Sequence, residues 1–527
     1  MVVRPSTRGA AALTRAVQEL YSQGQTDYSL EPIILVDEHE CPVGAIRDGD
    51  AVVFCCRRGE REVELTEAFT SPDFPHFTRP AFPDLDFVIL TLYHEKFKDL
   101  PVAFAPSHVK YTLAETVSRA GLRQLHIAES EKFSHVTFFF NGGHNQPFPG
   151  EQDIHVPSLH GLAFDQVPEM SLPQVTEQVI DGVHNQYDLI VTNFANGDVI
   201  GHTSNDQAKI QCASLLDSHM GRVLEAASAA GYVVLITADH GNLEAMRCAD
   251  GSPHVAHTAN PVPFLPIDSR SPIVEVRDGK LADVAPTVLA ALGLTQPGEM
   301  DSTSLLPQHA WNGQRRLLLV ILDGWGIGPQ DDTNPIFLAA TPHWDRLLAS
   351  HAHSQLQAAG SAVGLEPGKN GNSEAGHMNL GAGRVVPQDD VRLDQAMQDG
   401  SFYDNEILVH AIQHARQRAS ALHLICLLSE KSSHGSIDYP LAILKMAKAR
   451  GLDRAFVHVI FDGRSTQPGS APELLLKLEN RMDAIGAGQF ATGVGRGIAL
   501  DRDRNYDRIR RAFEAFVAGS GKKVRLD

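Results

Sequence analysis

The chain has 527 residues, 43% of them hydrophobic, and a formal net charge of −19. That length predicts roughly two to four domains, and the acidic balance argues against binding to nucleic acid or to an anionic membrane. No run approaches the ~18 apolar residues of a membrane span, and six cysteines without metal-type spacing predict reduced thiols and a cytoplasmic protein.

The first 106 residues predict one helix, three strands and a linker. Leu13, Val17 and Leu20 share one face of the helix, as an amphipathic helix requires. Each strand is a short apolar run, and the second leads into a cluster of arginines. We expect a helix over residues 9–30, strands over 33–36, 51–54 and 87–93, a linker over 101–106, and a basic cluster at Arg57, Arg58 and Arg61.

Alternation of strands and helices begins near residue 108 and resumes near residue 388, which is typical of α/β folds with mainly parallel sheets. A polar, irregular bridge over residues 298–316 interrupts it. In such sheets the loops at the carboxyl ends of the strands build the site, and here those loops hold Asp, His and Asn residues. The expected strands are 136–140, 189–192, 233–236, 317–322, 422–428 and 455–461.

One serine stands out because of the residues around it. Ser373 lies in Asn370–His377, where glycines permit a tight turn. A helix that starts after this serine would direct its N–H groups toward an anion. Asp323 comes at the end of the buried strand 317–322 and supplies a carboxylate. A serine in such a turn is more often only a helix cap, so its role as a nucleophile depends on what converges on it.

Carboxylates and imidazoles follow several of the predicted strands. Asp198 and His202 are four residues apart and would share one face of a helical turn. Any one such pair is as readily explained as a helix cap. Taken together, the groups supply oxygen and nitrogen donors for two divalent ions, and such ions activate a hydroxyl and neutralise a phosphoryl group. The candidate ligands are Asp198, His202, Asp239, His240, His257, Asp323 and Ser373.

An anionic substrate of this acidic chain needs a local basic pocket. Lys132 lies just before the predicted strand 136–140. Arginine suits bidentate capture of phosphate and carboxylate. Each arginine alone is more often a solvated surface charge, but several stand in Gly-flanked or turn-like contexts, which favours a binding role. These candidates are Arg58, Arg61, Arg464, Arg496 and Arg502.

Several different short motifs lie along the chain: Glu131–Lys132, His135–Gly143, Asn193–Thr203, Thr237–Asn242, Ala256–Thr258, Asp323–Gly326, Asn372–His377, Asp462–Arg464 and Asp501–Asp503. Together they resemble the cofactor-independent phosphoglycerate mutases of the alkaline phosphatase superfamily, over about residues 10–520. The order is rotated, because in that family the strand that ends in the Asp-Gly-Trp-Gly motif opens the chain.

This rotated order resembles a circular permutation whose cut lies near Gly521 and Met1, in the substrate-binding domain. The resemblance implies an alkaline-phosphatase-like sheet flanked by helices, plus a second α/β domain that binds substrate. The phosphatase-like domain would then be one continuous segment, and the second domain would be assembled from both ends of the chain. The expected boundaries are 108–387 for the first, and 1–107 with 388–527 for the second.

The resemblance also implies roles for the candidate residues. One ion would be held by Asp198, His202 and His257, and the other by Asp239, His240, Asp323 and Ser373, the serine that is phosphorylated in mid-cycle. Manganese is expected first, with zinc, magnesium and cobalt as alternatives. Lys132 and His434 would contact the phosphoryl group, and Arg58, Arg61, Arg464, Arg496 and Arg502 would hold a small phosphorylated acid. We expect a monomer without nucleic-acid or membrane partners.

The acceptor-side loops depart from the family pattern. Ser465 stands where the family has the second aspartate of an Asp-Gly-Arg-Asp motif, and the loop 429–436 keeps only one of two histidines, His434. A serine hydroxyl is a poor base at neutral pH. We therefore expect Ser465 to limit mutase activity, with Glu430 and Asp438 as the nearest substitute carboxylates.

Three functions remain open from the sequence. The first is metal-dependent interconversion of 3-phosphoglycerate and 2-phosphoglycerate through Ser373. The second keeps the phosphoserine but passes the group to water or to another acceptor, such as a phosphonate-type hydroxy-acid. The third, a non-catalytic binding protein, is disfavoured, because a retired site has no physical reason to keep costly clustered charges.

Overall fold

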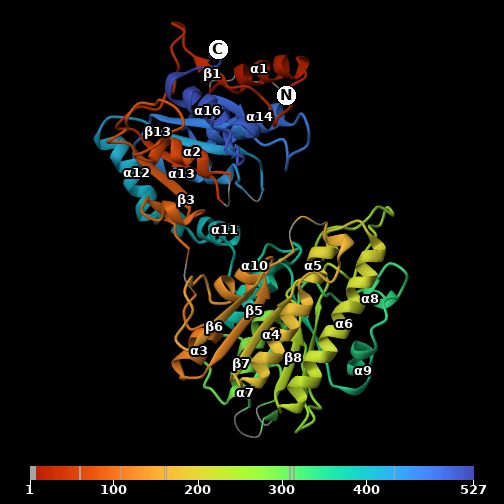
Figure 1. Ribbon diagram of the computed structural model, residues 1–527. Helices are drawn as coiled ribbons and strands as arrows, with labels where there is room; N and C mark the ends of the chain where they lie inside the picture. Colours follow the sequence, from red (N-terminus) through yellow and green to blue (C-terminus); the bar gives the residue numbers. More distant parts are fainter. Residues whose placement is uncertain are drawn as a thin grey trace. The chain divides into compact units, whose positions relative to one another are not determined.

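The computed structural model describes residues 8–526 except 58–60, 107–108, 160, 162, 308–309, 312–314 and 433. The chain forms two compact units (Figure 1): unit 1 combines Met1–Pro106 with Arg392–Asp527, and unit 2 is Ser107–Val391. The chain passes from unit 2 to unit 1 within α11 (Asp389–Asp399). None of the described helices is long and apolar enough to cross a membrane.

Unit 1 is built on an eight-stranded sheet in the order β16-β1-β15-β14-β13-β2-β3-β4. From β15 to β4 every neighbouring pair is parallel, so the carboxyl ends of these strands meet at one edge. β1 pairs antiparallel with β15 and parallel with β16, which joins the two distant chain segments of the unit in one sheet. The strands are β1 (Ile33–Val36), β2 (Ala51–Phe54), β3 (Asp86–Thr91), β4 (Val102–Phe104), β13 (Leu422–Leu428), β14 (Ala455–Phe461), β15 (Gln489–Gly495) and β16 (Lys522–Arg525).

Helices cover both faces of this sheet, as the alternation of strand residues demonstrates. In β2, Ala51 and Val53 belong to one apolar core, and Val52 and Phe54 belong to another. The first core includes α1, α12, α13 and α14, and the second includes α2 and α16. The helices are α1 (Ala10–Ser22), α2 (Val63–Thr70), α12 (Glu406–Gln417), α13 (Asp438–Ala449), α14 (Ala471–Ile485), α15 (Arg496–Ala499) and α16 (Tyr506–Ala518), with 3₁₀ turns at Glu95–Phe97 and Ser401–Asp404.

Unit 2 has a second eight-stranded sheet in the order β10-β12-β9-β8-β11-β7-β5-β6. The strands from β8 to β6 are all parallel, whereas β9 is antiparallel to both of its neighbours. β11 therefore enters the sheet between two strands that precede it in the chain. The strands are β5 (Gln124–Glu129), β6 (Glu151–Val156), β7 (Leu189–Phe194), β8 (Val233–Thr237), β9 (Val262–Asp268), β10 (Gly279–Lys280), β11 (Leu317–Leu322) and β12 (Ser354–Gln357).

The helices of unit 2 pack in two groups around this sheet (Figure 1). α4 and α6 pack on each other, and α3, α7 and α10 contact one another in the second group. The helices are α3 (Leu113–Arg119), α4 (Leu172–His184), α5 (Asn196–Gly201), α6 (Asp206–Ala229), α7 (Val284–Leu292), α8 (Pro335–Leu338), α9 (Pro342–Ser350) and α10 (Ser373–Ala382), with 3₁₀ turns at Phe164–Gln166, Leu281–Asp283 and Gly360–Val363. Two mainly parallel sheets flanked by helices confirm the predicted α/β fold class.

Two predictions for the first 106 residues are wrong in detail. The first helix ends at Ser22 and not at residue 30, because Gly24 takes a left-handed backbone conformation with φ of 84° just beyond it. Residues 101–106 are not only a linker, since β4 lies within them and pairs with β3 at the edge of the sheet. That pairing is non-local, so the sequence around β4 does not reveal it.

The predicted strand 136–140 is a π-helical turn, His135–Phe139, in the structure. The Phe140 N–H donates to the His135 carbonyl oxygen at 3.1 Å, a bond that spans five residues. The turn packs against α10, where a Cβ at Gly381 would lie only 1.9 Å from the Phe140 carbonyl oxygen. Close packing on this helix therefore overrides the β propensity of the phenylalanine run.

Candidate metal centre and acceptor cluster

The candidate metal ligands of unit 2 lie at the carboxyl ends of three neighbouring parallel strands, β8, β11 and β7. Asp239 and His240 follow β8, and Asp323 follows β11 directly. Asp198 lies in the short helix α5, which begins just after β7. Because parallel strands end at the same edge of the sheet, three carboxylates that are distant in sequence come together there.

Ser373 reaches this edge at the start of α10. The helix begins where it does because Asn372 caps it, with the side-chain oxygen of Asn372 accepting the N–H of Ala375 at 2.9 Å. Gly376 permits the close approach of the helix to β8, since a Cβ there would lie 2.6 Å from the Asp239 carbonyl oxygen. The serine is therefore held on a rigid helix terminus next to the carboxylates, where helix N–H groups favour negative charge.

Lys132 lies beyond the end of β5 and joins the serine to the carboxylates. Its ammonium nitrogen is 2.6 Å from Ser373 Oγ, 2.7 Å from Asp198 Oδ2 and 2.9 Å from Asp323 Oδ1. Burial alone would lower the pKa of Lys132, but the charges of Asp323, Asp198 and Asp239 outweigh it and raise the pKa. The lysine therefore stays positively charged beside the serine oxygen.

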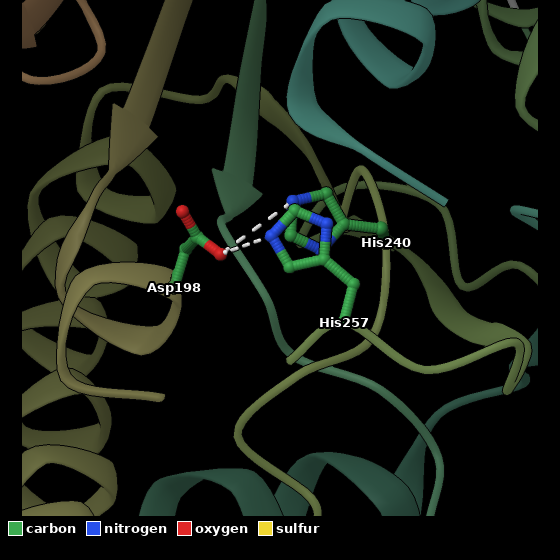
Figure 2. A group of neighbouring side chains, drawn as sticks. All are labelled: Asp198, His240 and His257. Atoms are coloured by element: carbon green, nitrogen blue, oxygen red, sulfur yellow. Dashed lines mark ion pairs between the residues drawn. The ribbon is translucent and has the colours of Figure 1, made fainter. Parts of the chain in front are cut away.

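Three histidines lie around the Asp198 carboxylate, and Figure 2 shows two of them, His240 and His257. Asp198 Oδ1 lies 3.0 Å from His257 Nε2, 3.2 Å from His202 Nε2 and 3.8 Å from His240 Nε2. The Nδ1 atoms of His257 and His202 hydrogen-bond to backbone carbonyl oxygens at 2.8 and 2.9 Å, which directs both Nε2 atoms at the carboxylate. The hydrogen bond to Asp198 raises the pKa of His202. A metal ion bound here would replace the protons on these Nε2 atoms.

The buried carboxylates beside this group also suit a cation. Asp239 is fully buried, and its Oδ2 has no hydrogen-bond partner among the residues that the structure describes. Burial and the charge of Asp239 raise the pKa of Asp323, as expected for like charges confined in one cluster. Ligand atoms of Asp239, Asp323 and His377 lie within 4.8 Å of one another. With oxygen and imidazole donors and no thiolate, these residues fit divalent metal ions.

Two asparagines that contact candidate ligands, and a glutamate that holds the neighbouring loops, were missed as site residues in the sequence. The Asn193 amide donates to Asp323 Oδ2 at 2.7 Å, and the Asn242 amide donates to Asp198 Oδ1 at 3.0 Å. Glu244 accepts the backbone N–H of Asn242 at 2.7 Å and a backbone N–H of the loop after β11 at 3.1 Å. Their positions in the same strand-end loops are the signal that could have identified them.

A second cluster of charged groups lies at the carboxyl ends of β2, β13, β14 and β15 in unit 1. Arg496, directly after β15, is buried and forms an ion pair with Asp462, which follows β14. Arg61 is buried and donates to a backbone carbonyl oxygen at 3.0 Å. His434 Nδ1 lies 3.1 Å from Oε1 of Glu62, whose side chain is fully buried. We call these side chains, Arg61, Glu62, His434, Asp462 and Arg496, the acceptor cluster. Arg61, His434 and Arg496 were candidates from the sequence, and Glu62 was not.

The remaining predicted substrate ligands of unit 1 that the structure describes are exposed. Arg464 and Ser465 are exposed in the loop after β14, where the Ser465 N–H donates to Asp462 Oδ2 at 3.2 Å. Arg502 is exposed. Arg58 lies outside the described residues. Of the predicted substrate ligands, Arg61 and Arg496 are thus the ones that the structure buries in the acceptor cluster.

Two family models match separate parts of this chain. Residues 37–296 match the model of the Metalloenzyme superfamily. Residues 393–526 match the model described as the BPG-independent PGAM N-terminus, iPGM_N. The chain therefore combines an alkaline-phosphatase-like metalloenzyme fold with a second α/β fold of the iPGM_N type.

Parts of the chain are also similar to individual proteins. The 2,3-bisphosphoglycerate-independent phosphoglycerate mutase of Syntrophotalea carbinolica is 47% identical over 294 residues, which is 55% of this chain and 56% of that protein. The enzyme of the same name from Moorella thermoacetica is 44% identical over 298 residues, 56% of this chain and 58% of that protein. The chain thus aligns with just over half the length of these relatives. A Leishmania mexicana phosphoglycerate mutase structure aligns over 52% of this chain and 53% of its own, with 30% identity and a TM-score of 0.41, too low to carry an argument.

Proposed function

We propose that the protein catalyses metal-dependent phosphoryl transfer through a phosphoserine at Ser373, and that it interconverts 3-phosphoglycerate and 2-phosphoglycerate. The carrying observation is that Ser373 Oγ lies 2.6 Å from Lys132 Nζ and 2.9 Å from His240 Nε2 at the start of α10. An ammonium and a helix N-terminus both favour the negative charge of a serine alkoxide and of a phosphoryl group. The similarity to enzymes named as phosphoglycerate mutases supports the choice of substrate.

We assign two divalent ions to the cluster in unit 2. When bound, they supply positive charge that lowers the pKa of the serine hydroxyl and neutralises phosphoryl oxygens. Asp198, His202 and His257 would hold one ion, and Asp239, His240, Asp323 and Ser373 the other. Manganese is our first choice, with zinc, magnesium and cobalt as alternatives that the same donors accommodate. Elemental analysis of protein reloaded from a mixture of these ions tests the choice.

The protein's own residues perform the remaining work of the cluster. Lys132 places its positive charge beside the serine oxygen. It therefore stabilises the Ser373 alkoxide that forms when the phosphoryl group is transferred to the acceptor. Asn193 and Asn242 each donate to one carboxylate and fix its orientation. Because these groups are buried and hydrogen-bonded before substrate arrives, little reorganisation is needed during transfer.

We assign substrate binding to the predicted domain 1–107 with 388–527 and phosphoryl binding to the predicted domain 108–387, bounds that differ by a few residues from those of units 1 and 2. The buried guanidinium groups of Arg61 and Arg496 suit the carboxylate or phosphate of a small phosphorylated acid. Arg58, Arg464 and Arg502 are proposed as further contacts, and His434 as a contact of the phosphoryl group or of the acceptor hydroxyl. Replacement of Arg496 by Lys should raise KM for phosphoglycerate, because the planar fork is lost.

We also propose that the chain is a circular permutation of the family's order. The matched segment described as an N-terminus follows the metalloenzyme segment here. β1 and β16 come from distant parts of the chain and are neighbours in one sheet, so a short linker could join them. A rearranged chain that begins near residue 315 and links residue 526 to residue 8 should fold and keep its activity.

Phosphorus NMR provides the main test of the proposed reaction. Metal-loaded protein is incubated with 3-phosphoglycerate, and 2-phosphoglycerate and free phosphate are followed separately. Appearance of 2-phosphoglycerate with little free phosphate supports the mutase. Free phosphate alone, or no reaction alongside turnover of a different phosphorylated or phosphonate-type acid, would favour the second enzyme function. The Ser373→Ala variant serves as the negative control.

We place the protein in the cytoplasm. All six cysteines are free, including Cys55 and Cys56 next to each other in sequence, which suits a reducing compartment. A monomeric state and the absence of nucleic-acid and membrane partners remain predictions, and sedimentation at several concentrations tests the first of them.

A further inference from the structure

One oxygen of a buried carboxylate in unit 1 contacts a histidine. Glu62 lies just before α2, and its side chain has no exposed area. Its Oε1 lies 3.1 Å from His434 Nδ1, and its Oε2 has no hydrogen-bond partner among the described residues. A buried carboxylate without full hydrogen bonding is destabilising unless it has a function or a charged partner.

The contact with Glu62 selects a tautomer of His434. An ionised carboxylate can only accept, so beside ionised Glu62 the Nδ1 of His434 carries the proton that the two groups share. The imidazole is then left with an unprotonated Nε2, and within the described chain no hydrogen bond to that atom is formed. The His434 side chain keeps 16% of its area exposed, so a small substrate can reach it.

The surroundings of Glu62 keep this pair polar. Burial raises the pKa of Glu62, opposed by His434 and by the charge of Arg496. Cys56 and Tyr93 also interact with it, and burial raises the pKa of each well above its usual value, so both stay neutral. Among the described residues, Arg496 and His434 are cationic or protonatable groups that favour the charged form of this carboxylate.

We propose that Glu62 and His434 form a base that takes the proton of the acceptor hydroxyl, in place of the carboxylate that Ser465 does not provide. His434 is the catalytic residue, and Glu62 is the positioning residue that holds its tautomer and stabilises the imidazolium. The proposal rests on the proposed function, and it deepens that function by identifying how the acceptor is activated.

The transfer step balances with these groups. The acceptor O–H bond breaks, its proton moves to His434 Nε2, and the oxygen's electron pair forms a bond to phosphorus. The bond between phosphorus and Ser373 Oγ breaks, and its electron pair stays on that oxygen beside the Lys132 ammonium. In the opposite direction, the imidazolium of His434 returns the proton to the departing glycerate oxygen.

Glu430 and Asp438, the two carboxylates in or next to the loop 429–436, form ion pairs at the surface. Glu430 forms an ion pair with Lys477, and its side chain is 58% exposed. Asp438 lies 2.6 Å from Arg481 and is 42% exposed. Neither contacts His434 in the described part of the chain. Glu430→Gln and Asp438→Asn are therefore matched controls, since each removes one carboxylate charge near the same loop.

The kinetic test compares two phosphoryl donors in wild type and Glu62→Gln. Loss of general base catalysis should lower kcat for phosphoglycerate by ~10²–10³-fold with KM nearly unchanged. Release of p-nitrophenol from p-nitrophenyl phosphate should stay near the wild-type rate, because this leaving group departs as a stable anion and needs no proton. Adding Ser465→Asp to the Glu62→Gln variant should recover at least ~10-fold of the lost activity. The two control variants should keep wild-type rates with both donors.

The proposal is overturned if Glu62→Gln leaves phosphoglycerate turnover intact, or if both donors are slowed equally, which would indicate a structural role. Nitrogen-15 NMR of the His434 imidazole gives a test that needs no substrate. The neutral ring should carry its proton on Nδ1 in wild type, and a proton on Nε2 would refute the pair. A wild type with this tautomer but without phosphoglycerate turnover would instead contradict the proposed function alone.

Discussion

Replacement of Lys132 by methionine tests the charge balance of the metal centre. The change keeps most of the side-chain volume and removes a buried ammonium that lies 2.7 Å from Asp198 and 2.9 Å from Asp323. Removing one partner from a buried charge pair costs about 3–5 kcal/mol of the free energy of unfolding. For a unit of this size, 1 kcal/mol corresponds to about 1.7 °C in Tm, so metal-free unit 2 should lose ~5–8 °C.

Tryptophan fluorescence isolates the unit in question, because all three tryptophans, Trp311, Trp325 and Trp344, lie in unit 2. Thermal unfolding is followed in chelator for wild type, Lys132→Met and the control Lys369→Met. Lys369 also has two carboxylate partners, at 2.8 and 2.9 Å, but it is 41% exposed, so its removal should cost no more than ~1 kcal/mol.

Manganese should then rescue Lys132→Met more than wild type. Once the ammonium is gone, the carboxylates attract a divalent ion more strongly, and each tenfold gain in affinity adds about 1.4 kcal/mol of stabilisation. Catalysis should still fall by ~10²–10³-fold, because the charge at the serine oxygen is missing. Equal melting temperatures for the two lysine variants in chelator, or equal protection by manganese, would refute this account of the cluster.

Three further outcomes are expected. Ser373→Ala should leave no phosphorylated serine by mass spectrometry and no mutase turnover, and full activity in this variant would exclude a phosphoenzyme. Ser465→Asp in the otherwise wild-type chain should raise phosphoglycerate interconversion at least ~10-fold, and no gain alongside efficient use of another acid would make position 465 a specificity residue. Burial lowers the pKa of His423 and His458, so the unfolded chain binds more protons below pH ~6.5, and unit 1 should lose up to ~1.4 kcal/mol per histidine for each pH unit of acidification. The urea midpoint should be measured between roughly pH 7 and pH 5, where this effect acts. Its dependence on pH should be weaker in His458→Gln than in wild type and the same as wild type in the control His39→Gln.

The sequence predicts which strands of unit 2 end in carboxylates, because those signals are local. An apolar run followed at once by Asp or Asp-His marks a strand and the group at its carboxyl end, and β11 with Asp323 and β8 with Asp239 follow that rule. The assignment of metal and phosphoryl roles to these residues still awaits the experiments above. Lys132 illustrates the partial success, since its candidacy came from the sequence while the strand expected after it is a π-helical turn.

What the sequence could not predict depends on contacts between distant segments. The π-helical turn exists because Gly381, more than two hundred residues later in the chain, lets α10 approach it. Glu62 stands in the run Glu60-Arg61-Glu62, which is typical of a solvated surface. Only the fold reveals that its carboxylate is buried against His434, a residue contributed by the other chain segment of unit 1.

Both clusters lie at the carboxyl ends of parallel strands, and this bears on the proposed rotation of the chain order. In unit 2 the central strand β11 lies between β8 and β7, although it follows both in the sequence. In unit 1 the strand β2 lies beside β13, although more than 350 residues separate them. A site built from the carboxyl ends of parallel strands depends on which strands are neighbours and not on the order in which the chain visits them. If the chain order is rotated as proposed above, the carboxylates and the serine would stay at the same sheet edge, so we expect the chemistry of this chain to be set by residues such as Ser465 and Glu62 and not by its connectivity.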